Sequence, residues 1–320
     1  MHYDVFNGDA DGLCALHQLR LDRPTESVLV TGVKRDIALL QRVDAGPGDS
    51  VTALDISLDT NRAALGTLLE RGVAVEYFDH HYAGTVPEHP RFRAHIDTAP
   101  RVCTGIIVDR HLAGRRRIWA VVAAYGDNLA AAAEELALPL KLDASRLAEL
   151  HELGDTLAYN AYGETEADLL VPPAQLYRLL ARHADPFTFM RDEPAFRAMS
   201  DGRRADLESA RVTSPDIALA GALVYILPDE PWSRRVQGVF ANELARISPN
   251  LAHAVLTPIA GDAYTVSVRA PIATRTGADA LCRQFATGGG RAAAAGINRL
   301  PRDDLPQFVQ ALGVAYPTAP

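Results

Sequence analysis

The side chains best suited to chemistry in this sequence are carboxylates and histidines that come directly after short apolar runs. They are Asp9 and Asp11, Asp55, and the triplet Asp79-His80-His81. An isolated Asp-x-Asp in a glycine loop is typical of a turn or a helix cap. Carboxylates after three separate apolar runs are instead the pattern of a metal site, because a coincidence would have to occur three times.

Four carboxylates in one crevice repel one another unless cations are bound between them. Two unit charges about 4 Å apart repel by roughly 4 kcal/mol at an effective dielectric constant near 20. A mixed set of carboxylate and imidazole ligands without a thiolate suits Mn²⁺, with Mg²⁺ or Co²⁺ as substitutes, better than a structural zinc ion. Two such ions that share a bridging carboxylate would match phosphoryl hydrolysis.

An alternation of strands and helices would bring these side chains together. Strand-like runs at Tyr3–Phe6, Ser27–Thr31, Val51–Leu54 and Val73–Phe78 alternate with helical patterns at Leu13–Leu21, Asp36–Val43 and Thr60–Arg71. This order predicts an α/β fold with right-handed crossovers and a parallel sheet. Ligands bind at the carboxyl ends of the strands in such sheets, and the candidate carboxylates follow those ends.

The rest of the chain predicts a helical layer and then a second, smaller α/β domain. Helical patterns cover Cys103–Leu112, Ile118–Glu135, Ala144–Leu157, Ala174–Arg182 and Val236–Ile247. Strands are expected at Ala252–Pro258 and Tyr264–Arg269, followed by a helix at Gly277–Phe285 and the glycine triplet Gly288–Gly290. We therefore predict a first domain over 1–185, a proline-rich connecting region over 186–235 and a second domain over 236–320.

Composition narrows the class of protein and of partner. The 320 residues are 48% hydrophobic and 22% charged, which is ordinary for a globular protein and excludes disordered and collagen-like classes. The net charge of -8 argues against a partner such as long duplex DNA, although a short oligonucleotide could still bind in a local pocket.

The cysteines and the apolar runs add two expectations. Cys14, Cys103 and Cys282 form no Cys-x-x-Cys pair, so a disulfide framework or a structural zinc site is not expected. The longest apolar runs are too short to span a membrane, so we expect a soluble, cytoplasmic protein without a membrane partner.

The loop Gly8-Asp9-Ala10-Asp11-Gly12, Asp55 and the triplet Asp79-His80-His81 resemble motifs I, II and III of the DHH phosphoesterase superfamily. This superfamily includes RecJ-type exonucleases, nano-RNase and pAp phosphatases, exopolyphosphatases and family II inorganic pyrophosphatases. Its motif IV is an aspartate at the end of an apolar segment. The segment that ends in Gly126-Asp127 matches it best, and Gly154-Asp155 is the alternative.

The C-terminal part resembles the substrate-binding domain associated with DHH proteins, in which a strand, a helix and a Gly-Gly-Gly-His segment follow one another. Here the segment reads Gly288-Gly289-Gly290-Arg291. Two positions depart from the family: Arg291 replaces the usual histidine, and Asn7 stands where motif I begins with histidine or aspartate. Without a ligand, the triplet would be the N-terminal turn of a helix, and Arg269 a solvated strand residue.

The resemblance implies a set of metal ligands. Asp9 and Asp55 would hold one Mn²⁺, and Asn7 could add only a weak, neutral ligand to it. A second Mn²⁺ would be held by Asp11, Asp55, His80 and Asp127, with Asp55 bridging the two ions. A water between the ions would attack phosphorus.

The resemblance also implies residues that contact the substrate. His81 would contact the phosphoryl oxygens or assist the leaving group, and Asp79 would orient a histidine. A terminal phosphate would be bound by Arg269, Arg291 and the amides of Gly288, Gly289 and Gly290, in a cleft between the domains.

The expected function is a metal-dependent phosphoesterase that hydrolyses phosphodiester or phosphomonoester bonds of short single-stranded oligonucleotides or nucleotide phosphates. Two alternatives stay open: an exopolyphosphatase or pyrophosphatase, and a nucleotide-binding protein in which Asn7 and Arg291 have impaired catalysis. A homodimer is consistent with the family, but the sequence shows no interface pattern.

Overall fold

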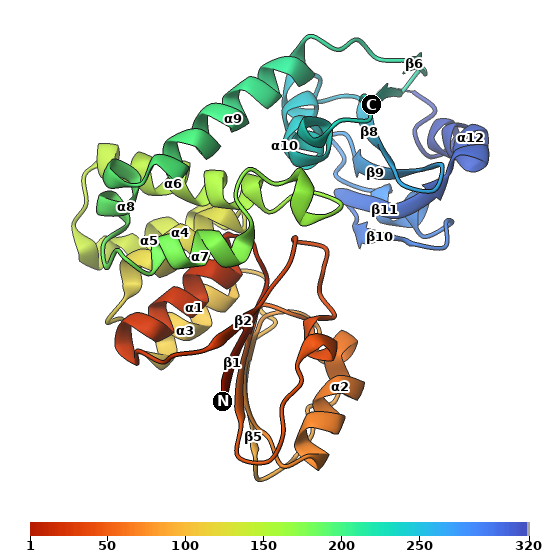
Figure 1. Cartoon of the computed structure of the whole chain (residues 1–320). Helices are drawn as coiled ribbons and strands as arrows, with labels where there is room; N and C mark the ends of the chain where they lie inside the picture. The colour runs from red at the N-terminus through yellow and green to blue at the C-terminus, as the bar shows by residue number, and fades with distance from the viewer. Residues whose placement is uncertain (319–320) are drawn as a thin grey trace. The chain divides into compact units, whose positions relative to one another are not determined.

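The computed structural model describes residues 1–318, and it divides the chain into two compact units. The first unit covers Met1–Asp201 and the second begins at Gly202. Each unit is built around a sheet of its own, as Figure 1 shows. The predicted α/β class with two sheets is confirmed.

The first sheet is entirely parallel. Its strands are β1 (His2–Phe6), β2 (Val28–Val30), β3 (Ser50–Leu54), β4 (Ala74–Asp79) and β5 (Phe92–Ile96), in the order β2-β1-β3-β4-β5. Phe6 pairs with Leu54, and Leu54 pairs with Phe78. The residues that follow these three strands therefore lie side by side at one edge, as the alternating pattern predicts.

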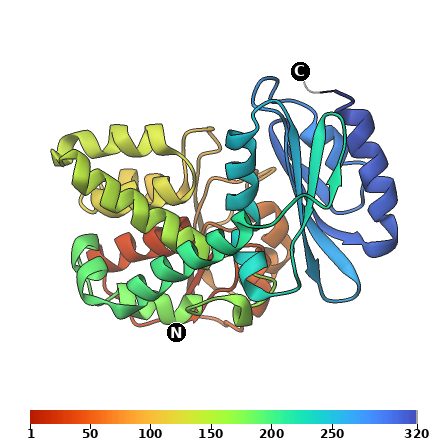
Figure 2. The ribbon, with the colours of Figure 1, turned by 90° about the horizontal axis from the view of Figure 1, so that it is seen from above.

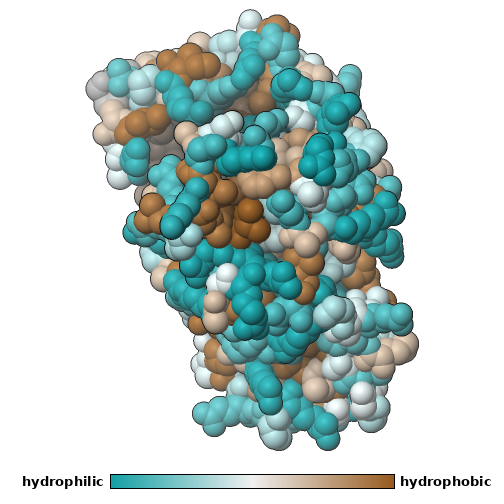
Figure 3. Space-filling view, turned by 90° about the vertical axis from the view of Figure 1, so that its left-hand side faces the viewer, coloured by the Kyte–Doolittle hydropathy of each residue, from teal (hydrophilic) through white to brown (hydrophobic). Residues whose placement is uncertain are grey.

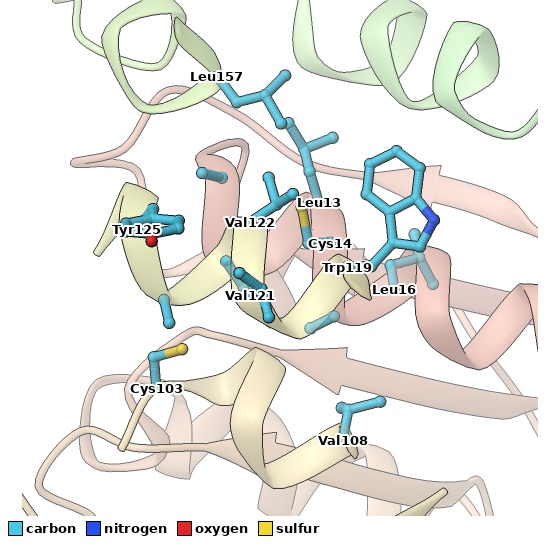
Figure 4. Close-up of a cluster of buried hydrophobic side chains, with 14 of the residues drawn as sticks. Leu13, Cys14, Leu16, Cys103, Val108, Trp119, Val121, Val122, Tyr125 and Leu157 are labelled. Atoms are coloured by element: carbon cyan, nitrogen blue, oxygen red, sulfur yellow. The ribbon is translucent and has the colours of Figure 1, made fainter. Parts of the chain in front are cut away.

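Helices cover both faces of this sheet. On one face lie α1 (Ala10–Asp22), α3 (Thr104–His111) and α4 (Arg117–Gly126), followed by α5 (Ala130–Ala137), α6 (Ala144–Asn160) and α7 (Pro173–Leu180). The other face is covered by α2 (Leu58–Glu70) (Figure 1). Figure 4 shows the core of the first face, where Leu13 and Leu16 of α1 pack near Trp119 and Val122 of α4. This apolar packing holds α1 and the loop before it against the sheet.

The segment predicted as one helix over Ile118–Glu135 is two helices. Helix α4 ends at Gly126, Asp127 is its C-cap, and α5 begins at Ala130. Asn128 lies between them with a φ of 60°, a left-handed conformation that asparagine tolerates better than most residues and that ends a helix. The break places Asp127 at a helix end instead of within a helix.

Two further predictions for this unit differ from the structure. The helix expected over Asp36–Val43 is only a short 3₁₀ turn at Leu39–Arg42, because the side chain of Asn61 binds the Leu40 amide and the Ile37 carbonyl and holds the segment in another conformation. Strand β5 was not predicted, although Arg93 and His95 alternate with apolar residues as in a half-buried edge strand.

The stretch 186–235, expected to connect two domains, consists largely of regular elements. It contains α8 (Pro186–Asp192), α9 (Pro194–Arg211), β6 (Ile217–Ala218), β7 (Ala222–Ile226) and the start of α10 (Pro231–Ile247). Pro186, Pro194 and Pro231 each begin a helix, a position where the missing N–H costs no hydrogen bond. These prolines therefore mark helix starts and not an extended linker.

The second unit has a mixed sheet in the order β10-β11-β9-β8-β7-β6. Its longer strands are β8 (Ala252–Ile259), β9 (Ala263–Arg269) and β11 (Ala294–Pro301). Figure 2 shows α10 on one face and α12 (Leu305–Ala315) on the other. The predicted helix at Gly277–Phe285 is confirmed over α11 (Ala278–Cys282). The glycine triplet lies in strand β10 (Gly288–Arg291), so its reading as a helix N-terminus is wrong.

Among residues 1–318, every helix is too short or too polar to cross a membrane. On the face in Figure 3, hydrophilic residues predominate and hydrophobic ones gather in separate areas.

Candidate metal centre

The loop between β1 and α1 is a tight turn that directs two aspartates in different ways. Asp9 is the N-cap of α1, and its Oδ1 accepts hydrogen bonds from the amides of Asp11 at 3.0 Å and Gly12 at 3.1 Å. A Cβ atom at Gly12 would overlap the carbonyl oxygen of Asn7, so the turn requires glycine there. Asp9 therefore does act as the helix cap that its loop suggested.

Asp11 ties this loop to the helix that follows β5. Its Oδ2 accepts the amide of Thr104 and its Oδ1 the amide of Gly105, each at 2.7 Å. Both amides belong to the first turn of α3, where backbone N–H groups have no partner inside the helix. Gly105 has little room for a side chain, because a Cβ atom there would overlap the Cβ of Ala123. Asp11 is held rigidly, and each of its oxygens keeps a lone pair for a further ligand.

Asp55 and His80 come from the ends of the neighbouring strands. Asp55 is 2% exposed, with a left-handed φ of 57°, and its Oδ1 accepts a hydrogen bond from the Thr104 hydroxyl at 3.2 Å. This conformation is uncommon for a residue other than glycine, and it is a typical feature of functional sites.

The ring of His80 is oriented by its backbone surroundings. Its Nδ1 donates a hydrogen bond to the carbonyl of Val102 at 3.0 Å, so the Nε2 lone pair is free to bind a cation. That Nε2 lies 3.4 Å from Asp55 Oδ1, 3.9 Å from Asp11 Oδ2 and 4.0 Å from Asp127 Oδ2. Ligands about 2.1 Å from a shared cation lie roughly 3 to 4 Å apart, so each carboxylate lies at a distance from Nε2 that a shared divalent ion requires. Asp55, His80 and His81 also offer ligand atoms within 4.8 Å of one another.

The electrostatics of this group show a shortage of positive charge. Burial, together with the negative charges of Asp11, Asp9 and Asp127, raises the pKa of Asp55 well above its usual value. Burial and the charges of Asp11 and Asp9 likewise raise the pKa of Asp127 to about 6, although Lys34 and His80 oppose the shift. Carboxylates that resist ionisation in this way are stabilised by a bound cation.

A second pair of side chains lies beside the first group. Asp79 accepts a hydrogen bond from Nδ1 of His81 at 2.7 Å and another from the His80 amide at 2.9 Å. Burial alone would lower the pKa of His81, but the hydrogen bond and the charge of Asp79 raise it above its usual value. The His81 side chain is 43% exposed, whereas Asp79 is fully buried. His81 is therefore held by Asp79 and accessible to a ligand.

Lys34, which sequence reasoning missed, is bound to Asp9. Its ammonium forms an ion pair with Asp9 Oδ2, and it lies 5.7 Å from the centre of the Tyr162 ring. Burial would lower the pKa of Lys34, but the charges of Asp9, Tyr162 and Asp127 hold it well above its usual value. Burial would raise the pKa of Asp9, but Lys34 and the Gly12 amide lower it to about 2.

Asn7 is also engaged within the loop. Its Oδ1 accepts the Asp9 amide at 3.2 Å, and its Nδ2 donates to the Lys34 carbonyl at 3.0 Å. The metal site implied around Asp9 and Asn7 therefore does not fit this chain as it stands. His80 and the three carboxylates near its Nε2 offer the donor types that a divalent cation binds.

The two aspartates considered for motif IV have different surroundings. Asp127 faces His80, whereas Asp155 lies 3.7 Å from His151 on the same helix, α6. The preceding glycines, Gly126 and Gly154, face each other, and a Cβ atom on Gly154 would lie 2.8 Å from the Gly126 nitrogen. The similar sequences reflect a close contact between α4 and α6.

The predicted phosphate-binding residues of the second unit all lie at β9 and β10. The Arg269 guanidinium donates to Asn242 Oδ1 at 2.5 Å, to Ser267 Oγ at 3.0 Å and to the carbonyls of Val268 and Gly238. Gly288, Gly289 and Gly290 pair with β11, and the Arg291 side chain is exposed.

A sequence signal for Lys34 existed. The carboxylates were found after β1, β3 and β4, and Lys34 stands four residues after β2, so the same search applied to the remaining predicted strand would have found it. Thr104 could not be found in this way, because β5 was not predicted.

The chain matches no family model and no curated protein sequence. Solved structures do match. A manganese-bound RecJ exonuclease matches with a TM-score of 0.64 and 16% identity, over 98% of this chain and 89% of that one. RecJ of Thermus thermophilus with Mn²⁺ matches with a TM-score of 0.58 and 17% identity, over 98% of this chain and 51% of the Thermus chain. The pGpG-specific phosphodiesterase PggH from Vibrio matches with a TM-score of 0.57 and 13% identity, over 97% of each chain.

These likenesses show the fold. The chain has a RecJ-like fold, which is the fold that its motifs predict, and it spans about half the length of the Thermus protein.

Proposed function

We propose that this protein is a metal-dependent phosphoesterase that hydrolyses phosphodiester or phosphomonoester bonds of short oligonucleotides or nucleotide phosphates. The observation that carries the proposal is that three carboxylates lie near Nε2 of His80, namely those of Asp11, Asp55 and Asp127. The hydrogen bond from His80 Nδ1 to the Val102 carbonyl leaves Nε2 unprotonated. The RecJ-like fold supports it, because the matched structures include RecJ with Mn²⁺ and a pGpG phosphodiesterase.

In this proposal Asp11, Asp55, His80 and Asp127 hold a divalent cation, with Mn²⁺ preferred and Mg²⁺ or Co²⁺ as substitutes. Such a cation supplies Lewis-acid polarisation of a phosphoryl oxygen and lowers the pKa of a water molecule. Asp11 and Thr104 keep the ligand carboxylates in place, since they connect the start of α1, Asp55 and α3 by hydrogen bonds. The positions of the ligands are therefore set before substrate binds.

His81 is the proposed proton donor and phosphate contact. Asp79 binds Nδ1, so Nε2 is the ring atom left to face a substrate. The raised pKa of His81 favours the protonated ring, which can donate a hydrogen bond to a phosphoryl oxygen and a proton to the leaving oxygen. Asp79 acts through His81 by fixing its ring, and is a positioning residue.

The substrate class rests on two further points. The Vibrio phosphodiesterase, whose fold matches over 97% of each chain, acts on pGpG, and this suggests a short linear dinucleotide as the first substrate to test. Arg291 is an exposed arginine on β10, and we propose that it binds a substrate phosphate through its guanidinium. Arg269 and the amides of Gly288, Gly289 and Gly290 are weaker candidates, because each already has partners within the second unit.

The test is product release from a panel of substrates, with Mn²⁺ and with EDTA. The panel holds pGpG, RNA and DNA dimers to pentamers, 3′-phosphoadenosine 5′-phosphate, pyrophosphate and polyphosphate. Release from the nucleotides that requires Mn²⁺ and is lost in His80→Gln is the expected result. Asp155→Asn is the matched control, since it removes the carboxylate that lies beside His151, and it should keep full activity.

Two outcomes would contradict the proposal. Activity confined to pyrophosphate or polyphosphate would establish the polyphosphatase alternative. Binding of nucleotides without turnover of any substrate in the panel would identify a nucleotide-binding protein.

A further inference from the structure

Lys34 is paired with Asp9, a residue that the family resemblance implies as a ligand of one of two metal ions. Asp9 and Asn7 would have been ligands of that ion, yet Asp9 Oδ2 is paired with the Lys34 ammonium and Asp9 Oδ1 accepts two backbone amides. Both carboxylate oxygens of Asp9 are therefore engaged. Asp11 differs, because its oxygens each accept one neutral backbone amide and are not paired with a cationic side chain in the hydrogen bonds that the structure describes.

The rest of the structure holds Lys34 in this position. The Lys34 amide donates to the Ala161 carbonyl at 2.9 Å, and its own carbonyl accepts the side chain of Asn7. The Tyr162 ring lies 5.7 Å from its ammonium. Asn7 thus supports the lysine through its backbone, and a charged histidine or aspartate at this position could not make the same amide contact in both directions.

The composition of the chain makes this lysine unusual. Of the 32 basic residues only Lys34 and Lys141 are lysines, and the others are arginines. Lysine carries a compact ammonium with three donors, which resembles a small cation more closely than the planar fork of arginine does. The neighbouring residue is Arg35, so the basic residue that faces Asp9 is the compact one.

We propose that this protein has a one-metal centre, in which the Lys34 ammonium takes the place of the first divalent cation and the groups around His80 bind the second. The inference rests on the proposed function. The carboxylates of the centre carry four negative charges, and one divalent cation with one ammonium reduces the total to a single negative charge. These carboxylates are Asp9, Asp11, Asp55 and Asp127. Two divalent cations beside the ammonium would leave the centre positively charged, with like charges in contact.

The experiment counts manganese in the full-length chain after loading with Mn²⁺ and dialysis, by elemental analysis and by electron paramagnetic resonance. One Mn²⁺ per chain with an uncoupled six-line spectrum is the expected result. In Lys34→Met the count should rise to two, and the spectrum should show exchange coupling between the two ions. Lys141→Met is the matched control, since it removes the other, exposed lysine, and should keep one ion.

A second histidine-containing group requires its own control. Glu76, His95 and His111 offer ligand atoms within 4.8 Å of one another and could bind an additional ion. That ion would not be coupled through Asp55, and His111→Ala would remove it.

The outcomes separate the inference from the proposed function. Two coupled ions in the unchanged protein would overturn the one-metal centre and leave the phosphoesterase standing. A count that stays at one in Lys34→Met, with the variant folded, would also overturn it. If Lys34→Met does not fold, the count and spectrum of the unchanged protein decide alone. No bound ion in any variant would contradict both proposals.

Discussion

The acidic edge of the first sheet and the arginine-bearing strands of the second unit differ in what orients their functional groups. In the first unit, strand ends and the first turn of α3 hold Asp11, Asp55 and His80, and the groups that could bind a cation face one another. In the second unit, Arg269 is bound by Asn242 and by backbone carbonyls. A parallel sheet brings the residues at its strand ends together at one edge. The side chain of a residue within an antiparallel strand instead contacts its cross-strand neighbours.

The motifs of the first unit and the resemblance in the second unit differ in how precisely they locate a site. The motifs at strand ends specify a place in three dimensions, since neighbouring parallel strands bring their ends together. The resemblance at Arg269 specifies a residue on a strand, and its side chain is satisfied within its own unit. Arg291, in contrast, has an exposed side chain.

The largest expected loss of activity follows from replacing Asp55 at the carboxyl edge of the first sheet. Asp55→Asn removes a charged ligand but retains a residue that tolerates the left-handed backbone at this position. We expect loss of Mn²⁺-dependent hydrolysis by about 10³-fold or more, equivalent to several kcal/mol of lost charge stabilisation. Steady-state kinetics and manganese analysis measure the effect, and circular dichroism checks the fold. Wild-type activity in this variant would remove Asp55 from the site.

The next prediction contrasts a core histidine with those of the site. His17 of α1 is buried, donates to the His183 carbonyl at 2.8 Å and packs edge-on against Trp119. Burial lowers its pKa from 6.5 to about 4, although the hydrogen bond to His183 opposes the shift. Between those pH values the unfolded chain binds a proton that the folded chain does not, so stability falls with decreasing pH.

This loss should approach about 3 kcal/mol of unfolding free energy as the pH falls from 7 to 4. Urea unfolding at several pH values measures it, with His17→Gln as the comparison. Stability of the variant should change less over this range. Equal pH dependence in both proteins would show that another group is responsible.

A smaller effect is expected at Asp79, which contacts His81 and the His80 amide. Asp79→Asn should lower kcat by about 10- to 100-fold, as is usual when a residue that orients a functional histidine is replaced. The pH profile of kcat should also shift, because the variant lacks the charge that raises the pKa of His81. An unchanged profile together with reduced thermal stability would indicate that Asp79 has only a structural role.

The smallest effects test the second unit directly. Arg291→Ala should raise KM about tenfold, with kcat and stability unchanged, if the arginine binds substrate and transition state equally well. Arg269→Ala should instead destabilise the protein by about 1 to 3 kcal/mol, because it leaves Asn242 without its charged partner. Kinetics and urea unfolding of both variants separate the two roles. A pure loss of kcat in Arg291→Ala would contradict ground-state binding.

By itself the sequence determined the α/β class, the parallel sheet and the identity of the residues at its edge, because the alternation of apolar runs sets the strands and each strand end is local. It also contained Lys34 after a predicted strand, although only the contact with Asp9 shows its significance. The helices within 186–235 were not predicted, since a proline at a helix start and a proline in a linker look alike in sequence.

The tertiary structure alone decided which of these groups meet. It separates Asp127, which faces His80, from Asp155, which lies beside His151, although both follow a glycine on an apolar helix. It also pairs Asp9 with the Lys34 ammonium, whereas the oxygens of Asp11 accept neutral backbone amides. The physical reason is that hydrogen bonds, ion pairs and close packing between segments far apart in the chain depend on distances that local patterns do not contain.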